Sequence, residues 1–412
     1  MKAYVEAYGC TLNFGESREV EALLRERGWE LVEEADDADL VVLATCVVIE
    51  TTERAMLKRL EELSGARRLI VTGCMASASR EKAERLVPNA WFVAPGDMSS
   101  LSALIEEAGP PLPRRAARSG SYGIVPIATG CVGTCSYCIT RLARGVLKSR
   151  GSRRIKDAVF GEVSAGPKEI RLTAQDTAAY GRDTGSDLPS LVREICQIPA
   201  DFRLRIGMMN PRSVLPIAGR IADMYLEPKV FKFLHLPVQS ASDRLLEQME
   251  RGYTVSDFRS IVGRVRGVSP PLTLSTDLIV GYPGETDADH RQNLALLSEI
   301  RPDIVNVTRF SARPGTKAAA ADDMVIGRKA KERSREITEL RFKVAEEVNR
   351  KWIGRRIKAL STEMGKKDST ILRNDEYKQI VVPEMLPLGR YFTVRIEGVT
   401  PAHLVAKRTD GM

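Results

Sequence analysis

The chain has 412 residues, a length that predicts two or three domains, and its 43% hydrophobic and 28% charged residues exclude a wholly disordered protein. Sixty-two Lys and Arg against 54 Asp and Glu leave a formal net charge of +8, which favours a polyanionic partner such as a nucleic acid. The longest apolar run near the start, residues 40–49, is too short to span a membrane, and the N-terminus lacks the apolar segment of a signal peptide, so we expect a cytoplasmic protein with no membrane contact.

Residues 1 to about 110 alternate short β-rich runs with amphipathic helical patterns, which predicts a parallel sheet with helical crossovers. Cys10, Cys46 and Cys74 each follow the C-terminal end of one of these β-rich runs. Because the carboxyl ends of parallel strands share one edge of a sheet, we expect these thiols to converge there. Three unrelated buried thiols are the alternative. The Pro, Arg, Gly and Ser residues at 110–121 then predict an exposed basic linker.

The chain after this linker predicts an incomplete TIM-like barrel of six βα units, with its active site at the C-terminal face of the strands. The strand-like runs are YGIVPIA, EIRLTA, RLRIGM, FKFLHLPV, LTLSTDLIVG and IVNVTRF. A long basic helix over residues 328–352 follows, and its charge suits either a solvated face or contact with phosphates. From about residue 354, short alternating segments separated by Gly, Pro, Asn and Asp predict a small all-β barrel. The overall fold class is therefore α/β with a C-terminal β-barrel.

The most specific motif is ATGCVGTCSYCITRLARG, in which Cys131, Cys135 and Cys138 have the spacing CxxxCxxC directly after the first barrel strand. A cytoplasmic protein keeps such thiols reduced, so metal binding is a better explanation than disulfides. A structural zinc site takes four protein ligands, and no fourth candidate is nearby. Three thiolates suit a 4Fe-4S cluster with one iron open to a substrate or cofactor. The alternative is a zinc knuckle completed by the distant Cys196 or by a histidine.

A CxxxCxxC loop after the first strand of a TIM-like barrel resembles the radical S-adenosylmethionine superfamily. The resemblance implies that the open iron of the cluster binds the amino and carboxylate groups of S-adenosylmethionine and that an electron donor is required. It also implies that Tyr137 packs near the adenine of S-adenosylmethionine. The segment TAQDT after the second strand then places Gln175 and Asp176 where contacts with the methionine amine are expected.

Further motifs along almost the whole chain resemble the methylthiotransferases within this superfamily. They are YGCTLN, ATCVV, VTGCMA, HLPVQSASDRLLEQMERGYT, DLIVGYPGET and FSARPGTKAA. The resemblance implies that Cys10, Cys46 and Cys74 hold a second 4Fe-4S cluster, which carries sulfur and accepts a methyl group. It further implies an N-terminal methylthiotransferase domain over residues 1–110, a radical core over 117–350 and a TRAM RNA-binding barrel over 351–410.

The expected substrate is tRNA. Residues 136–156 contain no acidic residue and seven basic ones, which are Arg141, Arg144, Lys148, Arg150, Arg153, Arg154 and Lys156. This pattern suits contact with RNA phosphates or an exposed basic loop. The segments YGCTLNFGES and TAQDTAAYGRD resemble the archaeal and eukaryotic branch that methylthiolates C2 of N6-threonylcarbamoyladenosine at position 37, in the anticodon loop of tRNA. The alternatives are N6-isopentenyladenosine in tRNA and an aspartate of a ribosomal protein. A non-enzymatic alternative is an RNA-binding protein stabilised by zinc.

Four more residues attract attention without an assigned catalytic role. His235, Gln239 and Asp277 fall near predicted strand ends, where they could line the barrel cavity. Cys196 lies in an amphipathic helical pattern, and we expect it to be a small buried hydrophobe that binds no iron. We expect the protein to act as a monomer.

Overall fold

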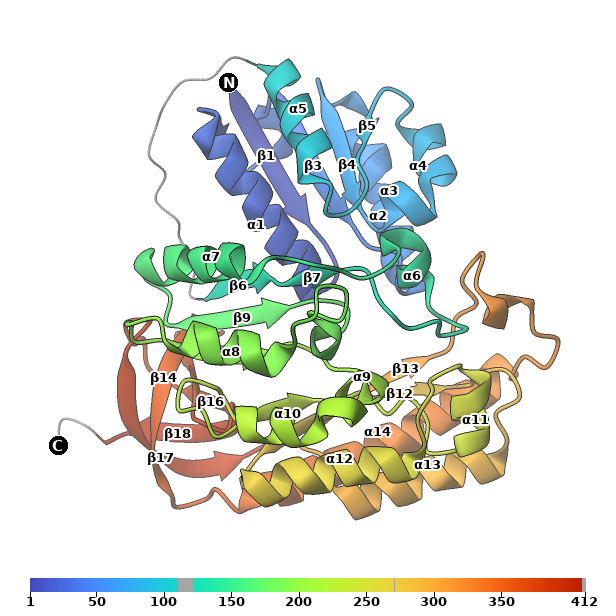
Figure 1. Cartoon of the computed structure of the whole chain (residues 1–412), viewed down its shortest axis with the longest axis vertical. Helices are drawn as coiled ribbons and strands as arrows, with labels where there is room; N and C mark the ends of the chain where they lie inside the picture. The colour runs from blue at the N-terminus through green and yellow to red at the C-terminus, as the bar shows by residue number, and fades with distance from the viewer. Residues whose placement is uncertain (110–121, 270, 410–412) are drawn as a thin grey trace.

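The computed structural model describes residues 1–109, 122–269 and 271–409. An N-terminal sheet with its helices lies on a central barrel, and a small β-barrel lies against the opposite side of that central barrel (Figure 1). The expected linker at 110–121 lies outside the described residues. Within the described part of the chain, none of the helices combines the length and apolar character needed to cross a membrane.

The N-terminal sheet has five strands in the order β2-β1-β3-β4-β5, and all of its pairs are parallel, which confirms the predicted architecture. The strands are β1 (Lys2–Ala7), β2 (Glu30–Leu31), β3 (Leu40–Thr45), β4 (Leu69–Gly73) and β5 (Trp91–Phe92). The helices are α1 (Thr11–Glu26), α2 (Glu50–Glu62), α3 (Met75–Ala78), α4 (Arg80–Leu86) and α5 (Met98–Ala108). Every residue of β3 is buried, because helices cover both faces of a central parallel strand.

The central barrel contains the six predicted parallel strands, arranged as two three-stranded sheets, β10-β9-β6 and β11-β12-β13. A parallel bridge from Leu204 to Val230 joins the two sheets. The strands are β6 (Gly123–Pro126), β9 (Glu169–Thr173), β10 (Arg203–Ile206), β11 (Phe233–His235), β12 (Thr273–Val280) and β13 (Ile304–Arg309). A short antiparallel pair, β7 (Ala128–Thr129) and β8 (Lys148–Ser149), flanks the cysteine loop.

Helices surround the outside of this barrel (Figure 1). They are α7 (Ser152–Ser164), α8 (Leu188–Cys196), α9 (Pro211–Val214), α10 (Ala218–Met224), α11 (Asp243–Gln248), α12 (Val255–Val268), α13 (Asp287–Ile300) and α14 (Gly327–Arg350). The short helix α6 (Ile139–Arg144) instead packs into the core of the N-terminal part through Ile139 and Ala143 (Figure 1). Capping boxes start α12 at Thr254 and α13 at Thr286, where the hydroxyl accepts from the N3 backbone amide and the N3 aspartate accepts in return. The long basic helix predicted at 328–352 is α14.

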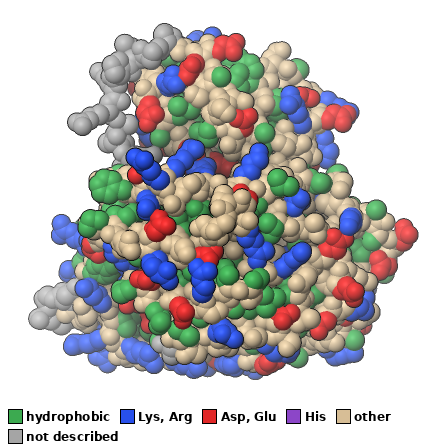
Figure 2. All heavy atoms as spheres, in the orientation of Figure 1, with side chains coloured by type: hydrophobic (Ala, Val, Ile, Leu, Met, Phe, Trp, Pro, Cys, Tyr) green, Lys and Arg blue, Asp and Glu red, His purple; other side chains and the backbone are tan. Residues whose placement is uncertain are grey.

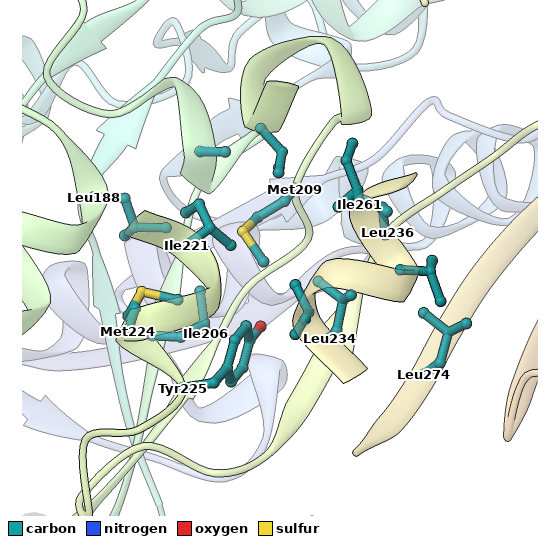
Figure 3. Close-up of a cluster of buried hydrophobic side chains, with 14 of the residues drawn as sticks. Leu188, Ile206, Met209, Ile221, Met224, Tyr225, Leu234, Leu236, Ile261 and Leu274 are labelled. Carbon is teal, nitrogen blue, oxygen red and sulfur yellow. The ribbon is translucent and has the colours of Figure 1, made fainter. Parts of the chain in front are cut away.

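Alternation along the barrel strands separates an apolar outer face from a polar inner face. Ile206, Leu234 and Leu274 point outward into a cluster with residues of the surrounding helices, such as Ile221 and Tyr225 (Figure 3). The residues that alternate with these along each strand therefore face the lumen. This face carries the arginines and the histidine of β9, β10 and β11 rather than a hydrophobic filling.

The C-terminal segment forms the predicted closed barrel, with strand order β14-β15-β16-β18-β17. Its strands are β14 (Arg356–Met364), β15 (Thr370–Arg373), β16 (Gln379–Val382), β17 (Tyr391–Val399) and β18 (Leu404–Arg408). The Tyr377 hydroxyl donates to Glu169 Oε1 at 2.5 Å, and Lys378 Nζ donates to Asp303 Oδ1 at 2.5 Å. These bonds tie the small barrel to the N-terminal ends of the central barrel strands.

Candidate active site

The first cysteine set lies at the carboxyl edge of the N-terminal sheet. Cys10 follows β1 and caps α1, Cys46 follows β3 and Cys74 follows β4. Cys10 is exposed, whereas the other two are buried. Gly9 has φ +104°, and a Cβ built there would lie 2.6 Å from Cys46 Cβ and 2.7 Å from Cys46 Sγ. Only glycine therefore lets the loop that carries Cys10 approach Cys46 this closely. Cys10 and Cys46 both lie close enough to Cys74 to influence its pKa, so the three residues are neighbours at this edge.

Burial disfavours the ionised form of two of these thiols, Cys46 and Cys74. Burial raises the pKa of Cys46, and burial raises the pKa of Cys74 to about 11. The guanidinium of Arg144 beside Cys74 acts in the opposite direction. At neutral pH Cys46 and Cys74 would therefore stay protonated without metal, and metal coordination would supply the energy for their ionisation.

Arg144 connects this edge of the sheet to the barrel. Its Nη1 donates to Glu16 Oε1 at 2.7 Å, and its Nη2 donates to Glu16 Oε2 at 2.8 Å and to Asn13 Oδ1 at 2.7 Å. The Arg144 side chain has no exposed surface. Asn13 in turn donates to the carbonyls of Tyr8 and Thr45, both at 2.8 Å. The helix α6, which follows the second cysteine set, is thus hydrogen-bonded to α1 and through Asn13 to the strand ends that bear the first set.

The second set, Cys131, Cys135 and Cys138, lies in the loop between β7 and α6. Arg141 Nη1 donates to the carbonyls of Cys131 at 2.7 Å and Gly133 at 2.8 Å, so the loop folds around one guanidinium. A Cβ built at Gly133 would lie 3.4 Å from Cys131 Sγ and 3.7 Å from Cys135 Sγ, so two sulfurs lie on the same side of this residue. Burial raises the pKa of Cys131 to about 11.

Arg251 is a functional candidate that the sequence did not single out. Its Nη1 donates to Cys135 Sγ at 3.2 Å and to the Tyr137 hydroxyl at 3.3 Å, and its Nε donates to the Tyr253 hydroxyl at 3.1 Å. Arg251 is buried. It offers fixed positive charge to a thiolate or to an anionic cluster at Cys135. Its place in the motif QMERGYT was the available signal, but nothing local indicated that it reaches a cysteine.

The three residues expected to contact S-adenosylmethionine have different surroundings. Tyr137 packs edge-on against Tyr282 with ring centroids 6.4 Å apart. Gln175 Oε1 is buried without a hydrogen-bond partner among the described residues, so it is free to accept from a bound amine. Asp176 is buried, and its oxygens accept from the Asn210 amide at 3.0 Å and the Ser213 hydroxyl at 2.6 Å. Gln175 fits a cofactor contact, whereas Asp176 anchors the start of α9.

Two cavities lie within the barrel lumen and at its mouth. The smaller, about 260 Å³, is lined by Val48 and Ile49 from the Cys46 loop and by Tyr137 and Cys138 from the other cysteine loop. The larger, about 610 Å³, extends through the lumen towards the C-terminal barrel and is also lined by Thr11, the residue after Cys10. The smaller cavity is thus bordered by Cys138 of one cysteine set and by residues that follow Cys46 of the other.

Three residues near strand ends, His235, Gln239 and Asp277, lie where these two cavities adjoin. His235 Nε2 lies 2.9 Å from Asp277 Oδ1, and Asn306 Nδ2 donates to the same oxygen at 2.7 Å. Gln239 adopts φ +68°, and its amide donates to the Asp277 carbonyl at 2.8 Å. Cys196 lies on α8, away from both cysteine sets, and packs against the main hydrophobic core.

Counted along the sequence, the basic residues at 136–156 are uncompensated charges, but several of them have acidic partners in the structure. Arg144 pairs with Glu16, Arg150 with Glu19, and Lys156 with Glu194. Arg141 is committed to the cysteine loop. The remaining residues, Lys148, Arg153 and Arg154, are exposed. Figure 2 shows Lys and Arg side chains gathered along the boundary between the N-terminal part and the barrel. A basic surface is therefore present, but fewer charges contribute to it than the segment contains.

The two cysteine sets have the kind of donors that hold iron–sulfur clusters. Each set offers three thiols, one with a neighbouring arginine, and the usual ligand of a 4Fe-4S cluster is cysteine. Among residues 1–109, 122–269 and 271–409, no three His, Cys, Asp or Glu side chains already converge on one point that would hold a single metal ion.

Comparisons with known proteins agree with this fold and site. Residues 125–297 match the radical SAM superfamily, and residues 2–94 match the uncharacterized protein family UPF0004. The radical S-adenosylmethionine methyltransferase TsrM from Kitasatospora setae, solved with cobalamin and a [4Fe-4S] cluster, has a similar fold, with a TM-score of 0.57, 14% identity and 77% of each chain covered. The barrel and its cysteine loop thus define a radical S-adenosylmethionine enzyme, which implies S-adenosylmethionine and a 4Fe-4S cluster as cofactors.

Full-length relatives give the family. A probable threonylcarbamoyladenosine tRNA methylthiotransferase from Pyrococcus horikoshii is 38% identical over 99% of both chains. A tRNA-2-methylthio-N(6)-dimethylallyladenosine synthase from Dictyoglomus thermophilum is 32% identical over 96% of both chains. The chain belongs to the methylthiotransferase family of radical S-adenosylmethionine enzymes.

Proposed function

We propose that this enzyme methylthiolates C2 of N6-threonylcarbamoyladenosine at position 37 of tRNA, with 4Fe-4S clusters held by Cys131, Cys135 and Cys138 and by Cys10, Cys46 and Cys74. The observation that carries the proposal is the shared cavity, because residues adjoining Cys46 and Cys138 line the same space of about 260 Å³. When bound, these clusters and S-adenosylmethionine supply the radical that removes a hydrogen atom and the sulfur and methyl group that replace it.

The chain's own residues position these groups. The bidentate contact of Arg144 with Glu16 holds α6, which follows one cysteine set, against α1, which follows Cys10, and proximity of that kind supplies much of the rate in reactions of several components. Arg251 holds the ring of Tyr137 and compensates negative charge at Cys135. Gln175 Oε1 accepts from the methionine amine, and Asp176 orders the neighbouring turn.

The choice of base rests on the relatives and on the lumen. The archaeal relative named for threonylcarbamoyladenosine is 38% identical, against 32% for the one named for dimethylallyladenosine. The larger cavity is lined by several arginines, which suit the carboxylate of the threonyl group better than an isopentenyl chain. N6-isopentenyladenosine is the second candidate.

The proposal includes an electron donor and three domains at 1–110, 117–350 and 351–410, the last an RNA-binding TRAM barrel. Both cysteine sets and the cavity come from one chain, so a monomer suffices for the reaction. Exposed cations on α7 and on the C-terminal barrel would contact the phosphates of the anticodon arm.

The test of the cluster assignment separates the two cysteine sets. Replacing Cys131, Cys135 and Cys138 by Ala should abolish 5′-deoxyadenosine formation and leave about four irons per chain, half of the eight that two clusters need. Replacing Cys10, Cys46 and Cys74 should leave 5′-deoxyadenosine formation intact and abolish methylthio transfer. Stoichiometric zinc and no iron in the anaerobically purified wild type would instead support the non-enzymatic RNA-binding alternative.

The test of the base is nucleoside mass spectrometry of tRNA from cells with and without the gene. Loss of the methylthio mark from threonylcarbamoyladenosine supports the proposal. Loss of the mark from isopentenyladenosine alone would overturn it.

A further inference from the structure

The larger cavity contains an arginine that the reaction described so far does not use. Five cationic side chains line this cavity, against two carboxylates. The cations are Arg171, Arg205, Arg341, Arg373 and Lys378, and the carboxylates are Asp303 and Glu363. The lumen therefore has an excess of positive charge. Its walls are formed by barrel strands, α14 and the C-terminal barrel.

Most of these cations have partners within the protein. Arg171 lies 2.9 Å from Glu363 and 2.6 Å from Glu169. Lys378 bonds Asp303, and Arg373 lies 3.9 Å from Glu363. Each of these pairs neutralises a charge that the lumen would otherwise have to accommodate.

Arg341 and Arg205 have no carboxylate partner among the described residues. Arg341 donates to the Val305 carbonyl at the wall of the lumen. Among the described residues, Arg205 has no carboxylate within ion-pair distance and no hydrogen-bond acceptor, only the face of Phe233, whose centroid lies 4.9 Å from the guanidinium carbon. Burial lowers the pKa of Arg205, and Arg171 and Arg373 lower it further, whereas Tyr377 and the carboxylate of Glu169 act in the opposite direction. Arg205 is half-buried, so its guanidinium is open to the lumen and available to an anionic ligand there.

The position of Arg205 relative to the cysteines suits one part of the substrate. Asn306 lines both cavities, and Asp277 bonds both Asn306 and His235 where they meet. In adenine, C2 and C6 lie on either side of N1, so the C2–H and C6–N6 bonds diverge from each other. A base whose C2 faces the cysteine-lined cavity can therefore direct its N6 substituent past these residues into the lumen.

We propose that Arg205 is the receptor for the carboxylate of the N6 substituent and the residue that distinguishes threonylcarbamoyladenosine from adenosines with uncharged N6 groups. The inference rests on the proposed function and deepens it. The planar fork of a guanidinium matches the two oxygens of a carboxylate, and the Phe233 ring holds that plane in place. An uncharged N6 group would leave Arg205 desolvated and unpaired, which is a strong basis for rejection.

The test compares Arg205→Met and Arg205→Lys with wild type. The RNAs are anticodon stem–loops carrying threonylcarbamoyladenosine, unmodified adenosine or isopentenyladenosine, and both binding and product formation are measured at fixed salt. Arg205→Met should reduce the preference for threonylcarbamoyladenosine over unmodified adenosine by about 100-fold or more, and Arg205→Lys should retain part of it. Reductive cleavage of S-adenosylmethionine should persist in both variants.

Two controls keep the result specific. Arg54→Met removes an exposed cation from the N-terminal part and should leave the preference unchanged. Because Met replaces an unpaired cation with an apolar chain of similar length, the melting temperature of Arg205→Met should equal or exceed that of wild type.

An unchanged preference in Arg205→Met, or a marked fall in its melting temperature, would overturn the assignment of Arg205 while leaving the proposed function in place. A wild-type enzyme that acts only on the isopentenyl stem–loop would overturn the proposed function and this inference together.

Discussion

The buried contact between Glu16 and Arg144 allows a quantitative prediction about how the N-terminal part is held on the barrel. Two hydrogen bonds of 2.7 and 2.8 Å join the carboxylate to the guanidinium, whose side chain is 0% exposed, against 10% for Glu16. Glu16→Gln preserves the shape of the side chain and removes its charge. It leaves Arg144 buried with only neutral acceptors, and breaking a buried pair in this way costs about 3–5 kcal/mol. Because an amide still accepts one bond, we expect about 3 kcal/mol.

Anaerobic urea unfolding, followed by the fluorescence of the buried Trp29 in the N-terminal part, measures this loss. The matched control is Glu50→Gln, which removes a carboxylate from an exposed pair with Arg54 and should cost roughly 0.5 kcal/mol or less. A double variant, Glu16→Met with Arg144→Met, should recover most of the stability lost in Glu16→Gln, because neither charge then remains buried. A loss in Glu16→Gln no larger than that in the control would refute this account of the interface.

Three further predictions concern packing, pH and RNA. Cys196→Ala should leave the iron content unchanged and lower the free energy of unfolding by about 1 kcal/mol or less, since the thiol is small and only partly buried; loss of four irons would contradict its assignment. Burial would raise the pKa of Asp289, but hydrogen bonds from two hydroxyl groups lower it to about 2. Its ionised form therefore contributes about 2 kcal/mol above roughly pH 4, which is lost as the pH falls towards 2, and Asp289→Asn should remove this part of the acid dependence of unfolding. Arg356, Arg395 and Lys407 form a row of exposed cations across β14, β17 and β18, and replacing all three by Gln should weaken tRNA binding and flatten the slope of log affinity against log salt by about 2–3, whereas an unchanged slope would exclude this face from the RNA contact.

Local patterns were sufficient to predict the architecture. The apolar run of β3 and the helical periodicity around it indicate parallel strands, and the shared carboxyl edge of such strands follows from their connection by crossovers. The positions of Cys10, Cys46 and Cys74 at that edge could therefore be predicted without coordinates. The same holds for the six strands of the central barrel and for its cysteine loop, because each depends on a short stretch of chain.

Neighbouring residues with similar sequence signals proved different once their contacts were known. Gln175 and Asp176 were equal candidates for a cofactor contact, yet Gln175 has a free buried oxygen and Asp176 is bonded to Asn210 and Ser213. The segment at 136–156 contains only basic charges over a long stretch, but acidic partners for Arg144 and Arg150 come from α1, about 130 residues earlier, with separations of 128 and 131. Charge counted along a sequence window is not the charge that a surface presents.

The sequence by itself thus determined the order of the elements and the two cysteine sets, because periodicity and spacing act over a few residues, whereas the class of chemistry followed from the resemblance to a known family. Only the tertiary structure decided which charges are paired and which are left for a ligand. Arg251 reaches Cys135 across 116 positions. Arg171 has Glu363 of β14 opposite it, whereas no carboxylate of the described residues lies within ion-pair distance of Arg205. Electrostatic partnership depends on distances of a few ångströms between distant parts of the chain, and local sequence patterns do not encode those distances.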